Sequence, residues 1–148
     1  MSSDAARADE ARRLATLVGD DHRAAYELVE RQLAVLVLRT QVLLSLSGIV
    51  ITVTGFSGRA IAQSGPAARY SIVVGILVVL LAALTAIGGV LRLRWLSQIL
   101  GADARTTLET GLALRDQKAR YLAVSMILFG VGFAAYCVAI AQLLLDPY

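Results

Sequence analysis

Three runs of uncharged, mainly apolar residues divide the chain, and each is long enough to form a membrane-spanning helix. They cover residues 40–58, 70–91 and 121–145, and each begins directly after an arginine. At about 1.5 Å per residue, about 20 apolar residues cross a hydrocarbon core of about 30 Å. A helix is expected because backbone polar groups in lipid must be satisfied within the segment. The pattern predicts an all-α integral membrane protein with three transmembrane helices and helical cytosolic extensions.

Two stretches of mixed polar and apolar residues separate the runs or precede them, and both are rich in helix-forming residues. Residues 1–39 contain one glycine and no proline, which predicts an amphipathic helix that leads into the first run and breaks near Gly19. Residues 92–120 are predicted to form a helical hairpin. Residues 59–69 are an expected external loop, and residues 146–148 an external C-terminus.

The basic residues lie mostly on one side of the three runs. Residues 1–39 and 92–120 together contain twelve Lys and Arg, whereas residues 59–69 contain two. Because basic loops stay in the cytoplasm, this asymmetry predicts a cytoplasmic N-terminus and an external C-terminus in the inner membrane of a bacterium. Residues 1–39 carry six Arg against seven Asp and Glu, which favours packing against other helices over binding to an anionic lipid surface. Two locations stay open for this helix: it lies on the membrane surface, or it packs in a cytosolic bundle.

Small residues recur at spacings of three and four in all three runs, where they permit close helix packing in lipid. They are Ser45, Gly48, Thr52 and Gly55; Ser71, Gly75, Ala82, Ala86 and Gly89; and Gly130, Ala134, Cys137 and Ala141. Two interpretations stay open: these residues join the helices of one chain, or at least one set makes subunit contacts or lines a pore. We expect Gly75→Leu and Gly130→Leu to separate helices, and Val79→Leu, on a lipid face, to be tolerated.

A second group of residues lies where the runs meet the predicted cytosolic segments. It combines arginine with aromatic side chains, as is typical of a membrane boundary. Its members are Arg39, Arg92, Arg94, Trp95, Arg120 and Tyr121. We expect these residues to form a cytosolic interface on which a cytosolic protein or a small-molecule trigger acts.

Composition narrows the function further. Hydrophobic residues make up 57% of the chain and charged residues 17%, unlike an ordinary soluble domain. The runs contain no charged residue and no histidine, which argues against a proton-coupled transporter and against an intramembrane metalloprotease. With Cys137 and His22 each single, no metal site is expected. We predict a non-enzymatic protein without cofactor, and basic residues at the ends of the runs do not predict nucleic-acid binding.

The order of the parts resembles one known family. A helical segment leads into RTQVLLSLSGIVITVTGF, a second span follows, and a last helix opens with the basic stretch of RDQKARYLAVSMILFGVGF. This layout resembles the small transmembrane effectors of bacterial cyclic-nucleotide defence systems, the Pycsar type, although the present chain has three spans. The resemblance implies an effector that disrupts the membrane when it is triggered.

These observations predict an oligomeric inner-membrane protein whose cytosolic helices respond to a partner and which forms a pore or disrupts the lipid bilayer. A homo-oligomer is expected because three helices leave more apolar surface than one chain can cover. The alternative is an accessory or structural subunit that stabilises a larger membrane complex.

Overall fold

A computed structural model describes residues 3–19, 21–57, 61, 65–91 and 104–145. The chain is all-α, as predicted, and the described residues form the helices α1 (Ser3–Val18), α2 (His22–Phe56), α4 (Pro66–Val90) and α5 (Ala104–Leu145), with no strand among them. Three helices are long and apolar enough to cross a membrane, and they contain residues 40–56, 70–90 and 121–145 of the three predicted runs. The fold is therefore compatible with a multi-pass membrane protein.

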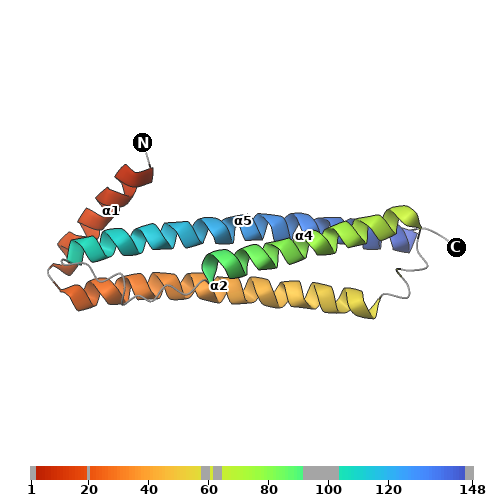
Figure 1. Ribbon diagram of the computed structural model, residues 1–148, viewed down its shortest axis with the longest axis horizontal. Helices are drawn as coiled ribbons and strands as arrows, with labels where there is room; N and C mark the ends of the chain where they lie inside the picture. Colours follow the sequence, from red (N-terminus) through yellow and green to blue (C-terminus); the bar gives the residue numbers. More distant parts are fainter. Residues whose placement is uncertain (1–2, 20, 58–60, 62–64, 92–103, 146–148) are drawn as a thin grey trace.

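The helices form an elongated bundle with two different halves (Figure 1). Helices α2 and α5 extend along its length, and α4 lies beside the half of α5 that leads to its C-terminus. The main contact in the bundle is between α4 and α5, and α2 packs against both. Helix α1 contacts α5 and α2 at the opposite end. We call the half that contains α4 the apolar half and the half that contains α1 the polar half.

The predicted break near Gly19 is present. Gly19 has φ +64°, a left-handed conformation that favours glycine, and it ends α1. Asp21 then caps α2, because its carboxylate accepts hydrogen bonds from the backbone N–H groups of Arg23 and Ala24. Helix α1 is therefore a separate element that is joined to α2 by a short turn.

Helices α2 and α5 are much longer than a bilayer core. Their 35 and 42 residues correspond to about 50 and 60 Å of helix. Each contains an uncharged run and a charged stretch in one unbroken element, so residues 104–120 of the predicted hairpin continue directly into the third run. The first part of that hairpin, residues 92–103, lies outside the described residues.

Helix α4 begins where its local sequence favours a helix start. Pro66 lies in the first turn, where its missing N–H costs no hydrogen bond, and Gly65 is the N-cap. The helix ends at Val90 with Leu91 as the C-cap.

The buried face of α2 continues from the polar half into the apolar half without interruption. Its members are buried and follow each other at steps of three and four: Ala25, Val29, Leu33, Leu36, Thr40, Leu43, Ser47, Val50 and Thr54. Helix α4 shows the same spacing from Ala68 to Val90. Such a repeat of about 3.5 residues keeps one seam of a helix against its neighbours. The opposite faces expose large apolar side chains such as Leu46, Leu77 and Val131, as lipid contact requires.

Candidate functional site

The backbones of α4 and α5 approach each other closely in the apolar half, at Gly75 of α4 and Gly132 of α5. A Cβ atom on Gly75 would lie 3.0 Å from the carbonyl oxygen of Gly132 and 3.1 Å from the backbone nitrogen of Tyr136. A Cβ atom on Gly132 would lie 2.9 Å from the carbonyl oxygen of Gly75. Backbone atoms in a helix cannot move aside, so this contact requires glycine on both helices. We call it the glycine seam.

The small residues predicted on α4 are buried or half-buried along the helix. Gly75, Ala82 and Ala86 are buried, and Ser71 and Gly89 are half-buried. The small set of α4 thus faces the other helices of the same chain.

The small residues predicted on α2 and α5 lie elsewhere. Those on α2 are exposed: Ser45, Gly48, Thr52 and Gly55. Those on α5 are exposed as well: Gly130, Ala134, Cys137 and Ala141. A Cβ atom on Gly48, Gly55 or Gly130 would meet nothing within 4 Å outside its own helix. The interpretation that these two sets join helices within the chain is therefore wrong, because both sets face outward.

Two expected effects of substitution change with this placement. Val79 is 0% exposed and packs beside the glycine seam, so it does not lie on a lipid face. Gly130 has free space around it, so a larger side chain there separates no helices of this chain. We therefore expect Gly130→Leu to be tolerated and Val79→Leu to disturb the packing of the helices.

Sequence reasoning missed the polar residues that α2 buries in the bundle. Thr40, Ser47 and Thr54 are buried at intervals of seven, and each hydroxyl donates to the carbonyl oxygen four residues earlier at 2.7–2.9 Å. These hydroxyls are satisfied within their own helix, so they pack as small side chains and offer no free donor. The signal was present in the sequence, because these positions continue the apolar face of residues 25–36.

The polar half is joined by an ion-pair cluster around Arg115 of α5. Its guanidinium donates two hydrogen bonds to the carboxylate of Glu10 on α1, at 2.7 and 3.0 Å. It also donates to the side-chain oxygen of Gln32 on α2, at 3.1 Å, and to Asp116. One side chain therefore connects three helices with bidentate geometry, the strongest form of such a pair.

The cluster shifts the acid–base properties of its members. The hydrogen bonds from Arg115 lower the pKa of the Glu10 carboxyl, against the opposing effect of burial. The same contact raises the pKa of the Arg115 guanidinium, which is already charged at any physiological pH. Both groups lie outside the three uncharged runs. Both therefore remain ionised at neutral pH, and α1 is held to α5 by charge.

The boundary between the two halves is marked by contacts at the last turn of α4. The Lys118 ammonium of α5 donates to the carbonyl oxygen of Val90 at 2.9 Å, which satisfies a free C-terminal carbonyl of α4. The Tyr121 ring lies so close to Gly89 that a Cβ atom there would be 2.3 Å from its Cγ atom. These two contacts fix where α4 ends along α5.

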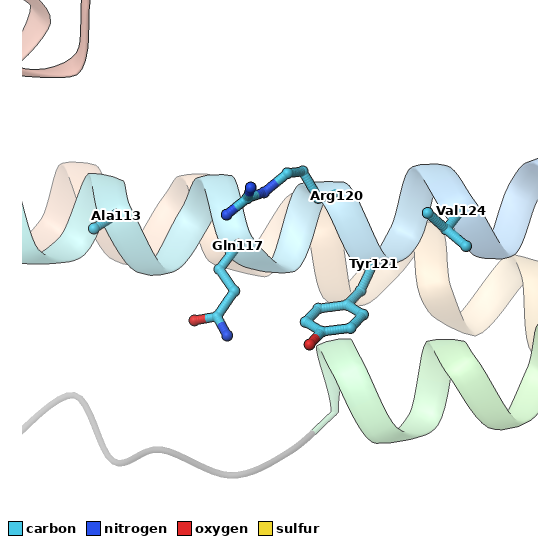
Figure 2. A pocket seen from close by; sticks show the side chains of 5 residues that line it. All are labelled: Ala113, Gln117, Arg120, Tyr121 and Val124. Atoms are coloured by element: carbon cyan, nitrogen blue, oxygen red, sulfur yellow. The ribbon is translucent and has the colours of Figure 1, made fainter. Parts of the chain in front are cut away.

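A groove of about 540 Å³ opens on α5 next to this boundary (Figure 2). Ala113, Gln117, Arg120, Tyr121 and Val124 line it, and the Gln117 and Tyr121 side chains project to the same side of the helix. Two predicted interface residues, Arg120 and Tyr121, thus contribute to one surface.

The other predicted interface residues do not join this groove. Arg39 is exposed on α2 and does not line it. Arg92, Arg94 and Trp95 lie outside the described residues.

Within the described ranges, no three His, Cys, Asp or Glu side chains gather in a group that could hold a metal ion. A comparison of the chain with protein-family models, with characterised proteins and with solved structures finds no match. Function must therefore be argued from the contacts described above.

Proposed function

We propose that this chain is a non-enzymatic, multi-pass protein of a bacterial inner membrane that acts as an oligomer. Three apolar helices with exposed Leu, Val and Ile side chains support the membrane location. The twelve-to-two distribution of basic residues supports a cytoplasmic N-terminus and an external C-terminus.

The outward-facing small residues of α2 and α5 carry the proposal of an oligomer. Helices in lipid associate by close packing, which small residues allow and branched apolar residues limit. In this chain α4 uses its small face within the protomer, whereas Gly48, Gly55 and Gly130 face outward with free space around them. A second copy of the chain supplies helices that these faces fit.

The proposed activity is to open or disrupt the bilayer under control of the polar half. Helices α2 and α5 extend from the ion-pair cluster into the apolar half as continuous elements. A cytosolic protein or small molecule that displaces α1 therefore acts on the same helices that carry the outward small faces. This supports an effector in which the polar half controls how the protomers pack.

The test of association is native mass spectrometry of the purified protein in mild detergent and in nanodiscs. We expect an oligomer for the unchanged chain and a smaller assembly for the double variant Gly48→Leu/Gly130→Leu. Val131→Leu is the matched control, because it enlarges an exposed residue outside the small set. Monomers at all protein concentrations, in both environments, would overturn the oligomer and the pore together.

The test of activity is release of a trapped dye from liposomes that contain the purified protein. Release that rises when residues 1–18 are deleted supports an effector restrained by α1. An oligomer that releases no dye with or without α1 overturns the effector. It favours the alternative, an accessory subunit of a larger membrane complex.

The test of orientation is labelling of single cysteines from outside intact cells, in a Cys137→Ala background. A cysteine at position 64 is expected to react, and cysteines at positions 3 and 110 are not. Thr110 is chosen because it is exposed, whereas the neighbouring Thr107 is buried. Reaction at position 110 would reverse the orientation or remove a span.

A further inference from the structure

The groove beside Tyr121 lies at the transition between the polar half and the apolar half, where the last turn of α4 meets α5. Lys118 bonds to the last turn of α4, and α5 continues from there to Ala104. Near this point the groove-lining residues Gln117, Arg120 and Tyr121 are exposed on α5. The groove spans this transition, since Val124 lies inside the uncharged run and Gln117 lies before it.

The polar end of the groove has the chemistry of an anion site. The Arg120 guanidinium, the Gln117 amide and the Tyr121 hydroxyl all supply hydrogen-bond donors, and the described residues that line the groove include no carboxylate. The described ion pairs of the polar half use Arg13, Arg23 and Arg115, and none involves Arg120. Arg120 is exposed, and its planar donors match the oxygens of a phosphate.

The other end of the groove has the chemistry of a lipid chain site. Val124 is half exposed and is the fourth residue of the uncharged run 121–145. The ring of Tyr121, the first residue of this run, packs against Gly89 of α4. Tyrosine and arginine are the side chains that membrane boundaries favour at headgroup depth. An occupant with phosphate at one end and hydrocarbon at the other therefore fits both ends at once.

We propose that this groove binds an anionic phospholipid of the surrounding bilayer, with Arg120 on the phosphate and the acyl chains along Val124. Lys118 is engaged by the Val90 carbonyl oxygen, so among the described residues that line the groove Arg120 is the cation offered to the phosphate. Basic pockets at the cytoplasmic ends of membrane helices recognise headgroups in this way. Lipid binding here does not require the oligomer proposed above.

The experiment compares lipid retention by native mass spectrometry of the full chain in mild detergent. The probes are phosphatidylglycerol and phosphatidylcholine with the same acyl chains, which differ in net charge. We expect the unchanged chain to bind phosphatidylglycerol about fivefold more tightly, since one arginine near the surface contributes about 1 kcal/mol toward an anionic lipid. Arg120→Gln is expected to lose this preference.

Arg39→Gln is the matched control. Arg39 is also exposed and also precedes an uncharged run, but it does not line the groove, so its loss should leave the preference unchanged. Equal loss in both variants would show a general effect of surface charge and would overturn the site. Absence of a headgroup preference in the unchanged chain would overturn it as well.

A competition with inorganic phosphate separates the lipid from a soluble anion. We expect millimolar phosphate to leave the bound phosphatidylglycerol in place, because the acyl chains contribute to binding. Displacement of the lipid by inorganic phosphate would show that the groove takes a free anion, and the lipid proposal would fail.

Discussion

The two halves of the bundle are held together by different means, although the same two helices extend through both. In the apolar half, α4 and α5 meet where side chains are absent, at Gly75 and Gly132. In the polar half, α1, α2 and α5 meet through the long side chain of Arg115 and its partners. Large aliphatic residues of α5, Leu108 and Leu112, are fully buried there.

The difference matches the surroundings that we propose for each half, lipid for the apolar half and water for the polar half. Leucine gains little by leaving lipid for a helix contact, so contacts in a bilayer depend on close approach. In water, burial of leucine is favourable and a partly exposed ion pair can be satisfied on its open side. The apolar half should therefore be sensitive to added volume, and the polar half to loss of charge.

The largest expected effect is that of Gly75→Leu. The new side chain would meet the backbone of Gly132 and Tyr136, which cannot move aside, and overpacking of this kind costs about 3 kcal/mol. Thermal unfolding followed by circular dichroism in one detergent measures it. Gly130→Leu is the matched control, with the same gain in helix propensity and free space around it. Equal melting temperatures of both variants would show that α4 and α5 do not pack through the glycine seam.

A second prediction uses two serines that are separated by one residue on α2. Ser47 is buried and Ser45 is exposed. Ser47→Leu adds volume to a closed face and is expected to cost about 1–3 kcal/mol, whereas Ser45→Leu adds an apolar group to an outward face and should change stability little. The same melting experiment compares them. The opposite order would mean that α2 is rotated relative to its neighbours.

The helices could be predicted from the sequence, since an uncharged run of some twenty residues has few other structures available. The break at Gly19 and the start at Pro66 could be predicted for equally local reasons. The faces of the helices were predicted less well. Residue size alone selected Ser45 and Gly48, whereas continuity of the apolar face from Val29 and Leu36 would have selected Ser47.

Gly130 and Gly132 of α5 also show that residue size alone does not predict which face of a helix is buried. The two residues differ by about 200° around the helix, and both are glycines in an apolar run. Extending the face of Leu122 and Ser125 by seven residues leads to Gly132, so register would have separated them. The contact of Arg115 with Glu10 joins residues 105 positions apart, and the groove depends on where α4 ends along α5. Neither has a local signal in the sequence.

A third prediction concerns charge in the polar half. Arg115→Gln removes the bidentate pair and should weaken the attachment of α1 by about 1 kcal/mol, a modest amount because the Arg115 and Glu10 side chains are 23% and 40% exposed. Arg13→Gln is the control, because the Arg13–Asp9 pair is far more exposed. Cleavage of the Gly19 turn by a protease, expected to be faster in the first variant, measures the effect. Equal cleavage rates in both variants would show that apolar contacts alone hold α1.

The smallest expected effect is that of acid on the same contact. The pKa of Glu10 is lower in the folded chain than in an unfolded one, so its contribution to stability is present above about pH 4.5 and is lost as pH falls through the folded-state value. A fluorophore on Leu17→Cys, in a Cys137→Ala background, reports attachment of α1 through its anisotropy, since Leu17 is 81% exposed.

We expect this anisotropy to fall on acidification in the otherwise unchanged chain and to vary less in Glu10→Gln. The uncharged runs contain no carboxylate, so helix content from circular dichroism should stay constant through the same range. A parallel loss of helix content would mean that acid disrupts the apolar half too, and the two halves would not be held by different means.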